Sequence, residues 1–299
     1  MHRYLEYGLE GHLQGPKTGG IISNNSIERG RMRTDAIKLE EIRLKGIDNI
    51  GDYCSLHERH RIFPAIFENR SHRKILDIAA GVGVVGKRIQ DNYKVADCKV
   101  DLVCNDISPT CLRIMKKIGL RTVSFNLDDE AKAFPVPDGT FDAIIALATI
   151  EHVINIDHFL IEIYRILKDN GHFYISAPNY SGLLYILPFI WSGKTFHDPM
   201  QEDSRYEFYA HVRYFTYKTL CNFVSSFGFM LDTVYIGLPK DSSRYKELYS
   251  RSKFKAVTFR SIMKLLSICF SPRWASEPVL CFRKPKIKSK VGKPRKVVL

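Results

Sequence analysis

The sequence lacks the patterns typical of disulfide-stapled, zinc-binding and membrane-spanning proteins. Its cysteines are odd in number and include no Cys-x-x-Cys pair, so we expect buried, reduced thiols at Cys54, Cys98, Cys104, Cys111, Cys221, Cys269 and Cys281. No stretch reaches the roughly 18 apolar residues that cross a bilayer, and the first residues have no apolar signal-peptide core. These absences predict a cytoplasmic protein with no transmembrane segment.

Acidic residues are scarce at the C-terminal end of the chain. Residues 240–299 contain seventeen Lys or Arg and three Asp or Glu, whereas residues 1–239 are close to neutral. A nearly neutral body lacks the basic surface that an enzyme acting on nucleic acid needs. Because the run from Arg283 to Lys296 is basic and contains two prolines, we expect 284–299 to be an extended, solvated tail. Such a tail is suited to weak, salt-sensitive contact with an anionic membrane or a nucleic acid.

Segments whose apolar pattern is typical of a strand alternate along the chain with segments whose apolar pattern is typical of a helix. This alternation predicts an α/β protein. At 299 residues and 45% hydrophobic composition, the chain is long enough for one large core. Residues 1–50 are polar and predict a partly mobile N-terminal extension, so that the body of the protein is 51–283. We expect strands near 74–79, 100–105, 121–126, 141–148, 172–177, 229–236 and 279–283, and helices near 54–69, 84–91, 108–118, 155–168 and 216–227.

A glycine-rich turn follows the first predicted strand. Residues 76–83 read Leu-Asp-Ile-Ala-Ala-Gly-Val-Gly, and the spacing Gly81-x-Gly83-x-x-Gly86 matches the dinucleotide-binding fingerprint. Asp77, however, places a carboxylate beside the turn, where it would repel a pyrophosphate and tolerate a cationic sulfonium. The turn therefore favours S-adenosylmethionine over NAD.

Further blocks continue this pattern in a fixed order: 105–109, 134–142, 150–153, 162–171 and 176–179. On these residues the chain resembles the class I S-adenosylmethionine-dependent methyltransferases, especially the type 11 and ubiquinone-biosynthesis methyltransferases. The resemblance implies a doubly wound, Rossmann-like α/β fold with a seven-stranded, mostly parallel sheet. The final strand, 279–283, would insert antiparallel, and S-adenosyl-L-methionine would be the cofactor.

Two acidic residues are expected at the cofactor. Asp106 ends the second predicted strand and would accept hydrogen bonds from the ribose hydroxyls, with Ile107 packed on the adenine. Capping of the following helix is the alternative role for Asp106, although Ser108 is better placed for it. Asp77 either orders the glycine turn by accepting backbone N–H groups or faces the cofactor.

Other cofactor contacts follow from the resemblance. The adenine amino group would meet the loop after the third strand, at Asn126, Leu127 or Asp128, and the sequence leaves this choice open. Gly81 and Gly83 lack a Cβ and would let the backbone approach the methionine moiety. Ala79 and Leu147 complete the expected set.

His152 is the best candidate for a general base. It follows the fourth predicted strand at the mouth of the crevice, and an imidazole titrates near neutral pH. A packing or capping role fits the sequence equally well. Some related quinone O-methyltransferases bind a metal through a Glu-x-x-Glu-His cluster here, but Ala148 stands in place of the first Glu, so we expect no metal.

The segment 179–214 interrupts the alternation of strands and helices and is expected to form a lid over the substrate. Its apolar run, Gly182–Trp191, suits a lipid or aromatic acceptor, although a helix packed on the sheet edge is the alternative. His211 and Arg213 are rim candidates, because similar insertions ending in His-x-Arg-x-Phe-Thr occur in glycan and small-molecule methyltransferases. A second, helical insertion is expected at 240–278.

The sequence thus predicts an S-adenosylmethionine-dependent methyltransferase that acts on a small-molecule, glycan or lipid-like acceptor, with oxygen as the preferred atom. The alternative is a nucleic-acid- or membrane-associated protein that retains this fold and works through its basic tail. An Asn/Asp-Pro-Pro-Tyr/Phe motif after the fourth strand would have indicated amino-group methylation of bases, and the chain has Ala-Thr-Ile-Glu-His there instead.

Overall fold

A computed structural model describes residues 36–52, 71–193, 197, 200, 208–236, 243–270, 272–286 and 296–298. The helix predicted near 54–69, the first 35 residues and Cys54 lie outside these ranges. Residues 36–299 form one compact unit.

The core of this unit is an eight-stranded sheet in the order β3-β2-β1-β4-β5-β7-β6-β8. All neighbouring strands run parallel except β7, which lies antiparallel between β5 and β6. The strand bounds are β1 Lys74–Asp77, β2 Asp101–Asn105, β3 Arg121–Val123, β4 Phe141–Leu147, β5 Leu167–Ser176, β6 Met230–Tyr235, β7 Val279–Arg283 and β8 Lys296–Val298.

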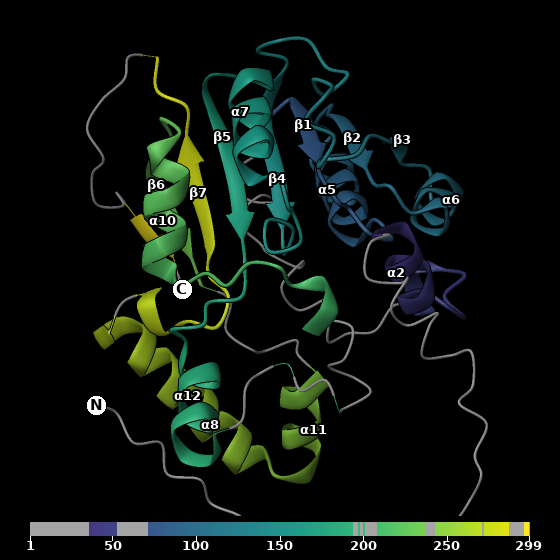
Figure 1. Ribbon diagram of the computed structural model, residues 1–299. Helices are drawn as coiled ribbons and strands as arrows, with labels where there is room; N and C mark the ends of the chain where they lie inside the picture. The colour runs from purple at the N-terminus through teal and green to yellow at the C-terminus, as the bar shows by residue number, and fades with distance from the viewer. Residues whose placement is uncertain are drawn as a thin grey trace, which may run out of the picture. The chain divides into compact units, whose positions relative to one another are not determined.

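Helices cover both faces of the sheet. On one face α5 (Val84–Val95) and α6 (Pro109–Lys117) share an apolar cluster with β1 and β2. On the other, α7 (Ile156–Ile166) and α10 (Tyr217–Ser226) pack over β4 to β7, as Figure 1 shows. Central strands such as β4 are buried on both faces, which explains their nearly continuous apolar sequence. The doubly wound α/β prediction is confirmed.

The helix α2 (Ala36–Arg43) attaches to the start of α6 through Glu41. The Glu41 carboxylate accepts hydrogen bonds from the Ser108 hydroxyl (2.5 Å) and from the Thr110 amide (3.2 Å) and hydroxyl (2.7 Å). Leu44, just beyond α2, is buried in the core, and a 3₁₀ turn follows at Ile50–Asp52. The part of the predicted N-terminal extension that the structure describes is therefore packed on the sheet domain.

Helical segments gather beyond the carboxyl ends of β4 and β5 (Figure 1). They are α8 (Leu183–Ser192), α11 (Ser243–Arg251), α12 (Lys253–Phe270) and the 3₁₀ helix η4 (Pro272–Trp274). They fall within the two segments that the sequence sets apart as insertions. Among the described residues, no helix is long and apolar enough to cross a membrane.

The sheet differs from the prediction at its last edge. All seven predicted strands are present, and 279–283 is antiparallel as expected. The chain then adds β8, which runs parallel to β6 with Val234 opposite Val297. The expectation of a wholly solvated tail over 284–299 is therefore wrong for 296–298. It is also wrong for Lys284, whose amide donates to the Gly171 carbonyl (3.0 Å), and for Pro285, which is buried. The two adjacent valines are a short β-forming signal that the surrounding basic residues obscured.

Candidate active site

The glycine turn after β1 is held in left-handed backbone conformations. Ala79, Gly81 and Gly83 have φ angles of 49°, 58° and 86°. Glycine adopts such angles without steric cost, whereas a residue with a Cβ is strained. The sequence therefore needs glycine at two of these positions, and Ala79 carries strain at the third.

Two of the three fingerprint glycines are also required by packing. A Cβ on Gly83 would lie 2.7 Å from Met115 Cγ and 2.8 Å from Leu120 Cδ1. A Cβ on Gly86 would lie 2.8 Å from Cys104 Sγ. These contacts bring α5 close to α6 and β2. The cofactor contact expected for Gly83 stays a prediction, and close packing is a second reason for glycine that the sequence did not reveal.

Asp106 and Asp77 place two buried carboxylates at the turn, and their side chains are 6% and 3% exposed. Asp106 accepts hydrogen bonds from the amides of Gly81 (2.8 Å) and Ser108 (2.9 Å). It therefore orders the turn, a role that the sequence analysis considered for Asp77. A carboxylate can accept about four hydrogen bonds, so these two leave capacity for ribose hydroxyls. Capping of α6 falls to Ser108, which accepts from the Cys111 amide (3.1 Å), as expected.

The pKa of the Cys104 thiol is affected by the negative charge of this region. Burial, then the nearby carboxylates of Asp77 and Asp106, raise the pKa of Cys104 far above its ordinary value. Burial likewise raises the pKa of Cys281, to about 12. These thiols stay protonated, and with Cys111 they are buried as expected. The expectation of burial is wrong for Cys269, which is exposed, while Cys98 and Cys221 are half-buried. The negative crevice suits a cofactor that carries a sulfonium and an ammonium group.

The loop after β3 is tied to the start of α7 by Asp128. Its Oδ1 accepts from the amides of Ile154 (2.7 Å) and Asn155 (2.9 Å). This structural role accounts for one oxygen of Asp128, while Leu127 packs against the core and Asn126 is exposed. Ile107 is half-buried and Leu147 is buried, and their cofactor contacts stay predictions.

His152 lies in the loop after β4 with a defined tautomer. Its Nδ1 is 3.0 Å from the carbonyl oxygen of Ala210, so Nδ1 carries the hydrogen. In the neutral ring Nε2 is then the proton acceptor. The side chain is 33% exposed, and Nε2 lies 4.0 Å from Oε1 of Glu151, which is 1% exposed. This carboxylate can stabilise the imidazolium that forms when His152 takes a proton.

A cluster of rings extends from His152 into the 179–214 insertion. The rings of His152 and His211 meet edge to face at 4.7 Å between centroids, and His211 meets His197 at 4.6 Å. The Tyr180 hydroxyl lies 2.7 Å from His197 Nε2 and 3.4 Å from His211 Nδ1. Burial lowers the pKa of His197 to about 4, so its ring is neutral at pH 7. We call His152, Tyr180, His197 and His211 the ring cluster.

The ring cluster is held by backbone bonds between the insertion and the β4 loop. The Glu151 carbonyl accepts from the amides of Val212 (2.9 Å) and Arg213 (3.1 Å). These bonds place His211 beside His152, and its expected role at the rim of the substrate site stays a prediction. Arg213 donates to the Ile154 carbonyl (2.9 Å). Sequence reasoning missed Tyr180 and His197, because only the tertiary structure shows that the insertion folds back onto the β4 loop.

Glu151, His152 and His211 also have the donor atoms of a possible metal site. One ligand atom from each lies within 4.8 Å of the others. A carboxylate with two imidazoles is a donor set that zinc and iron(II) accept. The expectation that the protein binds no metal therefore stays an untested prediction.

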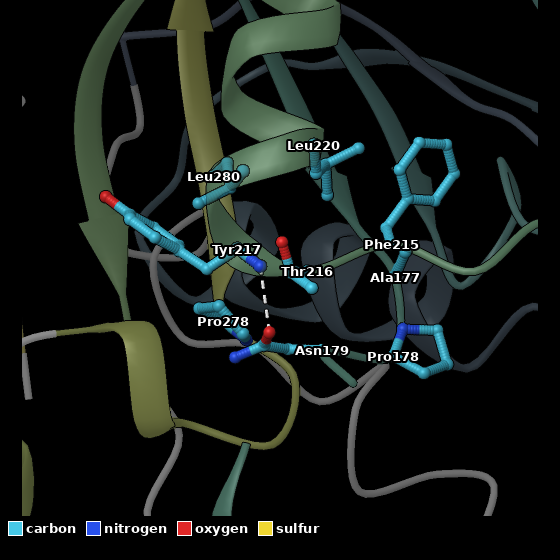
Figure 2. Close-up of a pocket in the computed structure, with 9 residues that line it drawn as sticks. All are labelled: Ala177, Pro178, Asn179, Phe215, Thr216, Tyr217, Leu220, Pro278 and Leu280. Atoms are coloured by element: carbon cyan, nitrogen blue, oxygen red, sulfur yellow. Dashed lines mark hydrogen bonds between the residues drawn. The ribbon is translucent and has the colours of Figure 1, made fainter. Parts of the chain in front are cut away.

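Asn179 joins three elements at the end of β5. Figure 2 shows its side-chain oxygen facing the backbone nitrogen of Tyr217, at 2.8 Å, at the start of α10. Its Nδ2 donates to the carbonyls of Arg273 (2.9 Å) and Ala275 (2.6 Å). The pocket drawn there does not admit a water molecule between its lining side chains. It is a packing recess, and its lining does not include Asp77 or Asp106.

The comparisons with known proteins agree with this geometry. Residues 49–234 match the family model described as a methyltransferase domain, which is more than half of the chain. The chain belongs to this methyltransferase family. It is a member of the class I S-adenosylmethionine-dependent methyltransferases, as the ordered motifs indicated.

Curated relatives match part of the chain. Malonyl-[acyl-carrier protein] O-methyltransferase of Geobacter sulfurreducens is 26% identical over 133 residues, 43% of this chain and 48% of the relative. The ubiquinone/menaquinone biosynthesis C-methyltransferase UbiE of Rickettsia akari is 28% identical over 167 residues, 50% of this chain and 65% of the relative. UbiE of Bartonella tribocorum is 34% identical over 107 residues, 34% of this chain and 40% of the relative. The chain thus spans less than two thirds of the length of each relative.

A solved structure shares the fold. A chain in the complex between the Haloferax volcanii Trm112 methyltransferase activator and a methyltransferase superposes with a TM-score of 0.51 at 14% identity. The match covers 79% of this chain and 93% of the other. At this identity the likeness shows the Rossmann-like fold alone.

Proposed function

We propose that the protein transfers a methyl group from S-adenosyl-L-methionine to a small-molecule, glycan or lipid-like acceptor, with oxygen as the accepting atom. The observation that carries the proposal is the ring cluster, in which the 179–214 insertion meets His152 on the loop after β4. Strand β4 is the neighbour of β1, which leads into the glycine turn. The relatives' names include both C- and O-methyltransferases, so family membership by itself leaves the accepting atom open.

The cofactor side is supported by charge and backbone. S-adenosylmethionine, when bound, supplies an electrophilic methyl group on a positively charged sulfur. Asp77 and Asp106 provide compensating negative charge in a buried setting, and Asp106 holds the backbone amide of Gly81 in the turn. The chain's main task is to hold the acceptor in line with the methyl group, because alignment supplies much of the rate in such transfers.

The acceptor side is supported by the proton chemistry of the ring cluster. A hydroxyl that gains a methyl group must lose its proton, and Nε2 of His152 can take it while Glu151 offsets the charge. Tyr180 presents its hydroxyl between His197 and His211, where it can orient a polar acceptor. These roles are proposals for residues whose geometry permits them.

Cofactor binding and product identification test the proposal. We expect Asp106→Asn to weaken S-adenosylmethionine binding by about 1.5–3 kcal/mol in titration calorimetry, because charge-assisted hydrogen bonds are lost. Asp101→Asn, at the opposite end of β2, is the matched control and should bind normally. Incubation with methyl-labelled cofactor and fractionated cell extract should then yield a labelled product with an ether or ester methyl group. Tight NADH binding would contradict the cofactor assignment, and a label on carbon or nitrogen would contradict the oxygen assignment.

A further inference from the structure

Two helices beyond the carboxyl ends of the strands expose large apolar side chains to solvent. On α8 and α12 these are Leu187, Phe189, Ile190, Trp191, Phe254, Val257, Phe259, Ile262 and Leu265. Trp191 is 92% exposed and Phe254 is 81% exposed. Single exposed apolar residues are common on protein surfaces, but a group of this size marks a surface that contacts a partner or a lipid.

Three of the five exposed apolar side chains of α12 form a stripe with a basic edge. Phe254, Val257 and Leu265 are spaced i, i+3, i+11 and therefore share one side of the helix. Lys253, Arg260 and Lys264 are spaced i, i+7, i+11 and form a row directly beside the stripe. Ala256 is buried away from the stripe, whose own side chains, Phe254, Val257 and Leu265, are 81%, 52% and 60% exposed. We call the stripe and its basic row the α12 surface.

The charge of the α12 surface selects among possible occupants. The sequence of α12 contains four Lys or Arg and no acidic residue, and residues 240–299 carry a net charge of +14 within a chain whose total is +13. A second copy packed on the same surface would oppose basic rows of like charge. A nucleic acid would match the charge but would leave the aliphatic stripe without a partner. An anionic bilayer matches both, since lysine and arginine reach phosphate headgroups while the apolar side chains enter the acyl boundary.

The α8 helix stands at the same end of the molecule. Its start is fixed to the segment after α12, because the Ser181 hydroxyl donates to the Arg273 carbonyl (2.9 Å) and a Cβ on Gly182 would touch Ala275. Its second half, from Leu187 to Trp191, is exposed. Tryptophan prefers the membrane–water interface, where its ring has an apolar body and a polar N–H.

We propose that α8 and α12 together form a docking surface for an anionic lipid bilayer, on which the protein lies without spanning it. The docking itself does not depend on methyl transfer. Where it is combined with the proposed function, it explains how a lipid-like acceptor would reach the ring cluster, because Tyr180 lies three residues before the first residue of α8 and the docked helix would hold the cluster near the bilayer.

Vesicle binding by the full-length protein tests the proposal. The chain has two tryptophans, so the Trp274→Phe variant leaves Trp191 as its only indole. Its emission should shift to the blue and be quenched by brominated acyl chains when vesicles containing about one third phosphatidylserine are added. Vesicles of phosphatidylcholine alone should produce a much smaller shift, and added salt should reverse the binding.

Charge and apolar variants locate the surface. Replacing Lys253, Arg260 and Lys264 with Gln should weaken vesicle binding by at least about tenfold, since one basic residue near an anionic membrane accounts for about fivefold. The control replaces Lys94, Lys99 and Lys116, exposed on the sheet domain, and should change binding by less than about twofold. Phe254→Ser with Leu265→Ser should weaken binding to a similar degree as the α12 charge variant and abolish quenching from the acyl chains.

Several outcomes would overturn the proposal. They are an unshifted Trp191 emission, equal loss of binding in the control variant, and tight RNA binding that the same α12 variants abolish. Concentration-dependent dimerisation lost in the Phe254 variant would identify a second copy as the occupant instead. Calorimetry with S-adenosylmethionine on each variant shows whether the cofactor crevice is intact, so a failure of docking is distinguished from a failure of the methyl-transfer proposal.

Discussion

At the scale of single residues, the active site combines a strained backbone with polar groups of defined protonation. Ala79 and Ala148 follow β1 and β4, and both have positive φ angles, 49° and 48°. The two loops that border the crevice thus each hold an alanine in a conformation that glycine adopts more easily. Strain of this kind persists only where the surrounding structure enforces it.

Substituting Ala79 tests this strain. We expect Ala79→Gly to leave the free energy of unfolding unchanged or to raise it by up to about 1 kcal/mol, because relief of the left-handed strain offsets the entropy of glycine in the unfolded chain. Ala80→Gly is the matched control, since Ala80 is buried without positive φ, and should lower stability by about 0.5–1 kcal/mol or more. Urea denaturation measures both. Equal destabilisation by the two variants would show that Ala79 is not strained.

Substituting His152 tests the proposed base. His152→Ala should reduce turnover by about 100-fold or more while cofactor affinity changes little, because only proton transfer is removed. The rate of the wild-type enzyme should fall on the acid side as the imidazole gains a proton, and this limb should disappear in the variant. Steady-state kinetics over pH, with calorimetry for the cofactor, provide the measurement. Unchanged turnover would assign His152 a packing role.

At the scale of elements, the most informative contact is the one between α2 and the start of α6. Burial alone would raise the pKa of Glu41, but hydrogen bonds from Ser108 and Thr110 outweigh it and hold the pKa below its ordinary value. The carboxylate also lies at the positive end of the α6 dipole. One side chain therefore attaches a helix that the sequence placed in a partly mobile extension.

The pH dependence of this attachment has a definite sign. Because the pKa of Glu41 is lower in the folded than in the unfolded protein, its stabilisation is complete above the unfolded value, near 4.3, and is lost as the pH falls through the folded value. We expect Glu41→Gln to lower the free energy of unfolding by about 1–2 kcal/mol at pH 7. The difference from wild type should shrink towards zero in acid.

Chemical denaturation at several pH values measures the effect of Glu41→Gln. Glu130→Gln, on an exposed loop, is the control and should have little effect at any pH. A loss of stability for Glu41→Gln that is the same at pH 3 and pH 7 would show that shape, and not charge, accounts for the contact.

At the scale of the whole molecule, the residues expected to bind the cofactor and the C-terminal strand β8 lie on different parts of the sheet. The loops that carry Asp77, Asp106 and His152 follow β1, β2 and β4, whereas β8, which includes Lys296, is the edge strand beyond β6. The two regions can therefore be changed separately. Weak contact of this basic segment with anionic membrane or nucleic acid remains a proposal, distinct from docking through α8 and α12.

Truncation after Lys286, compared with neutralising its lysines, distinguishes the structural role of β8 from the effect of the basic charges in this segment. Removing β8 leaves β6 as the edge strand, so we expect a loss of about 1–2 kcal/mol in stability and a greater tendency to aggregate. S-adenosylmethionine binding should not change. Replacing Lys288, Lys290 and Lys293 with Gln removes charge but keeps β8, and should leave thermal stability unaltered. Loss of cofactor binding on truncation would show that the sheet edge supports the crevice.

The sequence by itself determined the order of strands and helices along the chain and the glycine turn at which the cofactor is expected. It could do so because a buried parallel strand followed by glycines and an acidic residue is a local pattern, complete within about thirty residues. Ser108 as the cap of α6 is local in the same sense. The seven predicted strands follow from apolar runs that need burial on both faces.

Only the tertiary structure decided what depends on distant segments. Glu41 meets Ser108 across 67 residues, Gly83 meets Leu120, and Tyr180 meets His197 and His211 once the insertion folds back onto the β4 loop. Strand β8 exists because β6 offers unpaired backbone groups to a short valine pair. Apolar residues of α12 that look like a core stripe in the sequence lie exposed in the structure. Periodicity specifies which side of a helix is apolar, but packing decides what covers it.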